Sequence, residues 1–266
     1  MPFPDTKRII YKKNPLAEVI CQFRFPTILS IDTELPAKFQ TAIRKKYPLF
    51  KENAEILLRF PNVSSAAETP LADKIELPPA TLNRKNYEFL SADEKWKINL
   101  TREFLALSTT DYPRWEEFRA QLEQAFKPFV EIYSPVYFSR LGLRYKDIIN
   151  RSELGIKDTP WSELLKPYIL GMLNDAIVGP SISASNNVTE IKLSDKLSKL
   201  RITTGLVEES QTKEQAFMID SDFFTDEKTD IDKALEKLDF FNQRGSRLIQ
   251  WTITEKLHNA MKPEKI

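Results

Sequence analysis

Residues 113–149 read PRWEEFRAQLEQAFKPFVEIYSPVYFSRLGLRYKDII, and this stretch decides the fold. Its first part repeats apolar residues at intervals of three and four, the period of an amphipathic helix. Its second part alternates from residue to residue, the period of a strand with two different faces. We therefore predict a helix from Pro113 to Tyr133, capped by Asp111, and a long strand over Tyr137–Ile149. The apolar positions of the helix are Trp115, Phe118, Leu122, Ala125, Phe126, Phe129 and Tyr133.

The predicted strand has one largely apolar face and one basic face. The first face carries Ser139, Leu141, Leu143 and Tyr145, and the second carries Phe138, Arg140, Gly142, Arg144 and Lys146. Residues 17–25 alternate in the same way and predict another half-buried strand, which ends at Pro26. In that strand Val19, Cys21 and Phe23 share one face, while Gln22 and Arg24 share the other.

Strands and helices alternate in groups along the rest of the chain. Strands joined by short loops indicate antiparallel pairing, and the amphipathic helices must cover one face, so we predict an α+β fold. A polar stretch at residues 151–160 divides the chain into an N-terminal half, 1–150, and a loosely similar C-terminal half, 151–266, which we expect to pack as one unit. The further predicted strands are Ile56–Phe60, Tyr87–Leu90, Trp96–Leu100, Phe104–Leu107, Val188–Leu193, Leu200–Val207 and Ala216–Phe223; the further helices begin near Pro36, Trp161 and Ile231, the last interrupted at Gly245.

Composition excludes several classes of function. The 266 residues include 39 Lys and Arg against 38 Asp and Glu, which leaves a net charge of +1 and argues against a nucleic-acid binder that works through bulk charge. The 6 glycines are isolated, so neither a P-loop nor a dinucleotide-binding motif is present and we predict no cofactor. With one cysteine, no signal peptide and no long apolar run, the chain is predicted to be cytoplasmic, with no membrane association.

Four segments resemble a known family. They are NPLAEVICQFRFP at 14–26, FLALSTTDYPRWEEF at 104–118, RLGLRYKDII at 140–149 and WTITEKLHNAMKP at 251–263. The chain is similar along nearly its whole length to a sporadically distributed bacterial family of uncharacterised proteins, which commonly has Ile-Asn where this chain has Lys146-Asp147. The resemblance implies no activity or catalytic residue. The patchy distribution of the family implies an accessory locus, such as a mobile element, a toxin–antitoxin pair or phage defence.

Catalytic patterns are sparse, and the sequence leaves open whether the protein is an enzyme while favouring a protein that is not. The single histidine, His258, lies far along the chain from the single cysteine, Cys21, and is more typical of a helix surface than of a dyad or triad. We predict no catalytic residue and no metal site. The alternative is a metal-dependent hydrolase or nuclease in which Asp220 and Asp222, on one strand face, bind Mg²⁺.

The basic strand face is the main candidate for binding. If the strands carrying Arg24, Arg140 and Arg144 are neighbours, their guanidinium groups could clamp an anion or a carboxylate of a protein partner. The competing interpretation is a solvated sheet face on which the arginines pair with cross-strand acids. Tyr145 and Phe138 could instead stack on single-stranded nucleic acid together with the arginines, which is possible but not favoured. We predict a non-enzymatic interaction module with Arg24, Arg140, Arg144 and Tyr145 as binding residues; neither the partner nor the oligomeric state is predicted.

Overall fold

A computed structural model describes residues 3–54, 85–209 and 212–265, and within them one large antiparallel sheet organises the chain. The sheet has nine described strands in the order β3-β4-β5-β6-β2-β7-β10-β9-β8. The strand predicted at Ile56–Phe60 lies outside the described residues. β2 and β7 pair along Leu16–Arg24 and join the strands on either side into one continuous sheet.

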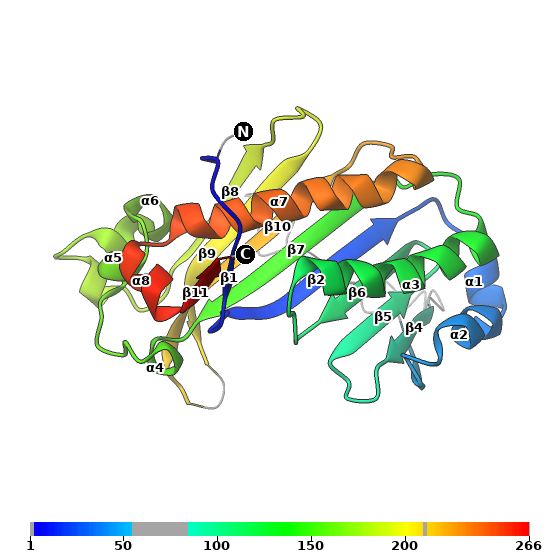
Figure 1. The fold of residues 1–266 in the computed structure, drawn as a ribbon, viewed down its shortest axis with the longest axis horizontal. Helices are drawn as coiled ribbons and strands as arrows, with labels where there is room; N and C mark the ends of the chain where they lie inside the picture. The colour runs from blue at the N-terminus through cyan, green and yellow to red at the C-terminus, as the bar shows by residue number, and fades with distance from the viewer. Residues whose placement is uncertain (1–2, 55–84, 210–211, 266) are drawn as a thin grey trace, which may run out of the picture.

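The large sheet runs from one edge of the molecule to the other (Figure 1). Its strands are β2 Leu16–Arg24, β3 Leu49–Ala54, β4 Lys85–Leu90, β5 Trp96–Leu100, β6 Phe104–Thr109, β7 Arg140–Ile149, β8 Asn186–Lys192, β9 Lys199–Glu208 and β10 Gln215–Thr225. The helices are α1 Ser30–Thr33, α2 Ala37–Ile43, α3 Trp115–Tyr133, α4 Arg151–Leu154, α5 Trp161–Leu164, α6 Pro167–Leu170, α7 Ala234–Thr252 and α8 Glu255–Ala260, with 3-10 turns η2 Gly171–Asn174, η3 Gly179–Ser181 and η4 Ile231–Lys233.

The two long helices, α3 and α7, lie on the same face of the sheet (Figure 1). α3 buries the predicted apolar stripe except Tyr133, which is half-buried, and its Phe126 packs on Phe23 of β2 with ring centroids 5.0 Å apart. α7 buries Leu238, Phe241 and Leu248 in the same core cluster. The predicted α+β class, an antiparallel sheet with amphipathic helices on one face, is therefore confirmed.

Three local predictions are wrong for identifiable reasons. Asp111 does not cap α3, because the helix begins at Trp115 and Arg114 occupies the N-cap position; the Asp111 carboxylate pairs instead with Lys95 of the neighbouring hairpin at 2.7 Å. The helix predicted from Trp161 breaks into α5, α6 and η2, because Lys166 precedes a proline and adopts an extended conformation. α7 continues through Gly245, where the helix lies so close to β7 that an added Cβ would be 2.9 Å from the ring of Tyr145.

A second, two-stranded sheet joins the ends of the chain. β1, Ile9–Tyr11, pairs with β11, Pro263–Lys265, and residues before β1 cross α7 (Figure 1). This segment is attached to α7 by the packing of Phe3 on Trp251, with centroids 5.3 Å apart, and by an ion pair between Asp5 and Arg247. Among the described helices, none combines the length and apolar character needed to cross a membrane.

Candidate functional site

The three predicted arginines do lie together on the sheet face opposite α3 and α7. β2 and β7 are neighbours, and Arg24 is directly opposite Arg140 in their register. β10 lies on the other side of β7 and places Asp222 opposite Arg144. The alternation of the sequence therefore brings Arg24, Arg140, Arg144 and the two aspartates of β10 onto one surface.

Both arginines of β7 form ion pairs with these aspartates. Arg140 Nη2 donates to Asp222 Oδ2 at 2.8 Å, and Arg144 Nε donates to Asp220 Oδ1 at 2.7 Å, with a second bond from Arg144 Nη2 to the other oxygen. The side chains of Asp220 and Asp222 are each 10% exposed, so the pairs are largely shielded from water. This is the cross-strand pairing of arginines with acids that the sequence analysis gave as the competing interpretation. Because both guanidinium groups already bind a carboxylate, they have little capacity to bind an external anion.

Gly142 does not provide space for a ligand backbone, since the guanidinium of Arg140 folds over it. A Cβ at Gly142 would lie 2.5 Å from Arg140 Nη1. The same guanidinium carbon lies 4.9 Å from the ring centroid of Phe224 on β10. Arg24, in contrast, is exposed. The face thus holds one exposed arginine beside a packed ion-pair network.

The described residues form no evident site for a metal ion at Asp220 and Asp222, or for a catalytic pair of Cys21 and His258. Asp220 and Asp222 already accept hydrogen bonds from arginines, so a metal ion would have to displace both cations. In the part of the chain that the structure describes, no three His, Cys, Asp or Glu side chains are close enough to hold a metal ion together. Cys21 is buried in the core, and His258 Nδ1 lies 2.9 Å from the hydroxyl of Tyr11 on β1.

Tyr145 lies on the helix side of β7, away from the arginines. It is 8% exposed, and its hydroxyl donates to Asn242 Oδ1 of α7 at 3.0 Å. Burial raises the pKa of Tyr145 well above its ordinary value. In this position it cannot stack on a nucleic acid bound at the opposite face, but it lines a cavity between the sheet and the helices.

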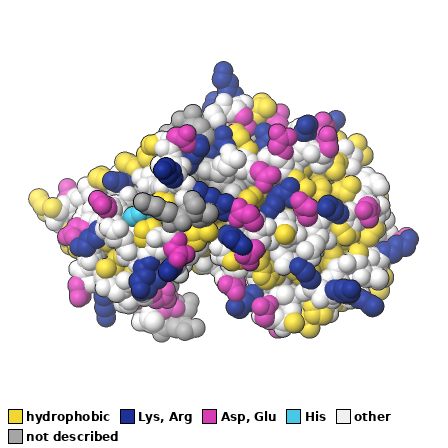
Figure 2. Space-filling model, in the orientation of Figure 1, with side chains coloured by type: hydrophobic (Ala, Val, Ile, Leu, Met, Phe, Trp, Pro, Cys, Tyr) yellow, Lys and Arg dark blue, Asp and Glu magenta, His cyan; other side chains and the backbone are white. Residues whose placement is uncertain are grey.

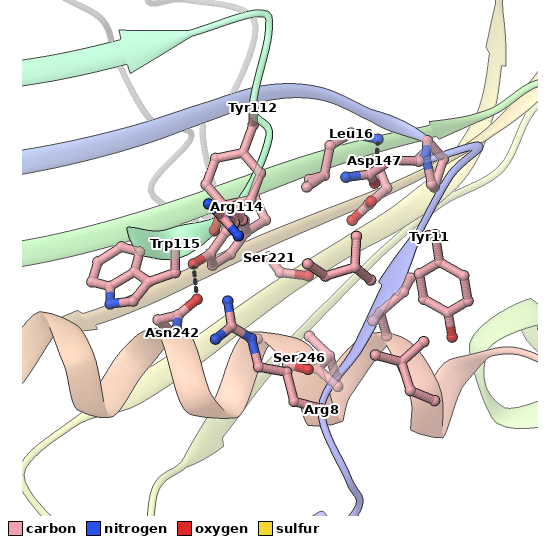
Figure 3. Close-up of a pocket in the computed structure, with 18 of the residues that line it drawn as sticks. Arg8, Tyr11, Leu16, Tyr112, Arg114, Trp115, Asp147, Ser221, Asn242 and Ser246 are labelled. Atoms are coloured by element: carbon pink, nitrogen blue, oxygen red, sulfur yellow. Dashed lines mark hydrogen bonds between the residues drawn. The ribbon is translucent and has the colours of Figure 1, made fainter. Parts of the chain in front are cut away.

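This central cavity has a volume of about 110 Å³ and is lined by five segments of the chain (Figure 3). β7 and β10 form its floor, α7 and the start of α3 form its walls, and the segment around β1 covers it. The lining is mostly apolar with a few polar groups. Its main side chains are Arg8, Tyr11, Leu16, Tyr112, Arg114, Trp115, Tyr145, Asp147, Ile219, Ser221, Asn242, Ser246, Leu248 and Ile249.

A second, polar hollow of about 430 Å³ adjoins the central cavity and shares with it Tyr11, Asn14, Leu16, Tyr112 and Pro113. Lys12, Thr110 and Asp111 line its remaining part. The hollow lies between the β1–β2 connection and the β6–α3 connection.

Hydrogen bonds and ion pairs hold the walls of the cavity together. Trp115 Nε1 of α3 donates to Asp239 Oδ1 of α7 at 2.7 Å. Arg8 forms a bidentate pair with Glu116, with Nη2 to Oε2 at 2.8 Å, which lowers the pKa of Glu116 to about 2. Arg114 pairs with Glu117 at 2.9 Å. Both lining arginines are therefore neutralised by acids at the N-terminal end of α3.

The residue that the sequence analysis missed is Asp147. It is 6% exposed, and it occupies a core-facing position of β7, two residues after Tyr145. The signal was available, because Leu141, Leu143, Tyr145, Asp147 and Ile149 share one face and four of these five are apolar or aromatic. An acid in such a row is unusual enough to indicate a special role.

Outside the cavity, the face that carries α3 and α7 shows acidic and basic side chains interspersed (Figure 2), in keeping with the net charge of +1.

No protein-family model and no curated protein matches the chain. Any assignment of function therefore depends on the geometry of the central cavity and of the sheet face.

Proposed function

We propose that this chain is a binding protein for a small organic molecule, held in the central cavity. The observation that supports this is the convergence of side chains from five separate segments on one hollow lined by aromatic rings, hydroxyls, an amide and a carboxyl. Small-molecule sites have this character, with a mostly apolar lining and a few placed polar groups. A cavity of about 150 Å³ accommodates benzene. The central cavity, at about 110 Å³, is smaller, so it suits a short aliphatic body, or one ring that extends into the adjoining hollow.

Filling the cavity is expected to abolish binding. Ser246 of α7 is half-buried and lines the cavity, so Ser246→Phe would place a ring where the ligand body lies. A library of single-ring fragments would be screened against the natural chain by ligand-observed NMR, and we expect some of them to bind. Their affinity for Ser246→Phe should be at least about tenfold lower, a loss of about 1.4 kcal/mol in binding free energy.

Gln243 offers the matched control, since it lies on the same helix, is exposed and is not part of the lining. Gln243→Phe adds the same ring outside the cavity and should leave the affinities unchanged. If every fragment that binds the natural chain binds Ser246→Phe equally well, the central cavity is not the ligand site.

The protein-partner function that the sequence favours stays a prediction, as do the accessory locus and the cytoplasmic location. The ion pairs of Arg140 and Arg144 weaken its main support, because both guanidinium groups are already bound within the sheet. The nuclease and nucleic-acid alternatives stay predictions as well, and no feature of the described residues favours them over the central cavity.

A further inference from the structure

Asp147 places a carboxyl group inside the central cavity, and no side chain among the described residues forms an ion pair with it. Its side chain points toward the other cavity-lining groups (Figure 3) and the residue is 94% buried, being 6% exposed. Across residues 3–54, 85–209 and 212–265, no group donates a hydrogen bond to this carboxyl and no Lys, Arg or His pairs with it. Buried carboxylates are ordinarily hydrogen-bonded or paired, because removing their charge from water costs several kcal/mol.

The neighbours of Asp147 explain why it has no partner in the part of the chain that the structure describes. Its register partners are Leu16 on β2 and Ile219 on β10, which offer apolar side chains. The positively charged residues of the lining, Arg8 and Arg114, form ion pairs with Glu116 and Glu117. Desolvation, with a smaller contribution from Asp220, raises the pKa of Asp147 to about 7.

The backbone beside Asp147 is irregular, because the pairing of β2 with β7 contains a bulge there. The pairing of β2 with β7 shifts between Leu16 and Glu18, so Ala17 is an extra residue directly next to Asp147. Such bulges bend a strand and are frequent beside binding sites. Beyond the bulge, the amide of Ile148 donates to the carbonyl of Pro15 at 2.8 Å, so the strand pairing resumes while the cavity remains.

We infer that Asp147 binds the positively charged nitrogen of the ligand, and that the central cavity takes a small primary amine on an aromatic or short aliphatic body. This inference rests on the proposed function. An ammonium group would supply the hydrogen bonds and the charge that Asp147 lacks, and the rings of Tyr112, Tyr145 and Trp115 would favour a cation and an apolar body. A ligand with an anion at this position would meet an uncompensated acid.

The experiment compares ligands that differ in the head group alone. Tyramine, 4-ethylphenol and 3-(4-hydroxyphenyl)propionate share one ring and carry an amine, no charge and an acid; isobutylamine, isobutanol and isobutyrate do the same on a smaller body. Affinities are measured by NMR at about pH 8 for the natural chain, Asp147→Asn and Ser246→Phe. Asp158→Asn, an exposed aspartate outside the cavity, is the control.

We expect at least one of the two amines to bind the natural chain at least about tenfold more tightly than its uncharged and acidic counterparts. The preference for amines should vanish in Asp147→Asn and persist in Asp158→Asn. Ser246→Phe should lose all binding. If the uncharged molecules bind as tightly as the amines and remain sensitive to Ser246→Phe, the ligand site stands and the amine assignment is wrong. If none of the molecules shows binding that Ser246→Phe removes, the amine assignment is overturned, and the fragment screen decides separately on the cavity.

Discussion

Replacing Asp147 with asparagine is expected to raise the free energy of unfolding by about 2–4 kcal/mol at about pH 8. The carboxyl has a pKa of about 7 in the folded chain, against about 3.9 in an unfolded one. Ionising it therefore costs more in the folded state than in the unfolded state. Asparagine has nearly the same shape and carries no charge, so it removes this cost.

The sign of the pH dependence follows from the two pKa values. Below about pH 4 the carboxyl is protonated in both states and the variant gains nothing. Between about pH 4 and 7 the folded chain holds a proton that the unfolded chain has lost, so the stability of the natural chain falls relative to the variant as pH rises. Above about pH 7 the difference is constant.

Urea unfolding of both chains at several pH values would measure the difference. The other titratable and charged groups around Asp147 are the same in both chains and cancel, to first order, in the comparison; they are Arg8, Tyr11, Tyr112, Arg114, Tyr145, Asp220 and, beyond Tyr11, His258. Asp158→Asn should have no comparable effect. A variant less stable than the natural chain at about pH 8 would show that Asp147 has a stabilising partner in the folded protein, contrary to the structure.

Removing Arg140 is expected to destabilise the protein by about 3–5 kcal/mol in Arg140→Ala. The substitution leaves the carboxylate of Asp222, 7% exposed, without the guanidinium that lies 2.8 Å away. It also removes the cation above the ring of Phe224. An uncompensated buried charge costs far more than a surface ion pair contributes. Thermal or urea unfolding would show the loss directly.

Two further variants separate structure from function on this face. Arg24→Ala removes an exposed arginine directly opposite Arg140 and should change the free energy of unfolding by less than about 0.5 kcal/mol. The double variant Arg140→Met with Asp222→Asn removes both charges and should recover much of the stability lost in Arg140→Ala. If Arg140→Ala is as stable as Arg24→Ala, Arg140 is not structural and the partner-binding hypothesis gains support.

Sequence periodicity predicted well those elements whose buried face is marked by a regular pattern of apolar residues within the element itself. α3 has a continuous apolar stripe and β7 has a strict alternation, and each is formed much as predicted, with β7 beginning at Arg140. The helix expected from Trp161 did not form as one element, because Pro167 cannot continue α5 and instead begins a separate short helix, α6. Gly245 interrupts a helix in isolation, but close packing on Tyr145 favours a residue with no side chain at that point of α7.

The candidate site was predictable only in its parts. Alternation in β7 assigns the arginines to one face and Asp147 to the other, and an acid among core positions is visible in the sequence without any structure. The other residues of the central cavity come from segments around positions 8–16, 112–115, 219–221 and 242–249. No local pattern connects these segments, since their meeting depends on strand order and on where the helices cross the sheet.

The sequence by itself determined the α+β class, the two faces of β2 and β7, and the absence of phosphate-binding glycine motifs, because periodicity and composition act over a few neighbouring residues. Tertiary structure decided the partners. It placed β10 beside β7, so that Asp220 and Asp222 neutralise arginines that lie 76 and 82 residues earlier in the chain. It also placed apolar side chains, Leu16 and Ile219, opposite Asp147 on the two neighbouring strands, so that neither neighbour offers this acid a charged partner. Whether a charge is satisfied depends on what lies within a few ångströms of it, and for a β-strand that is decided by distant segments of the chain.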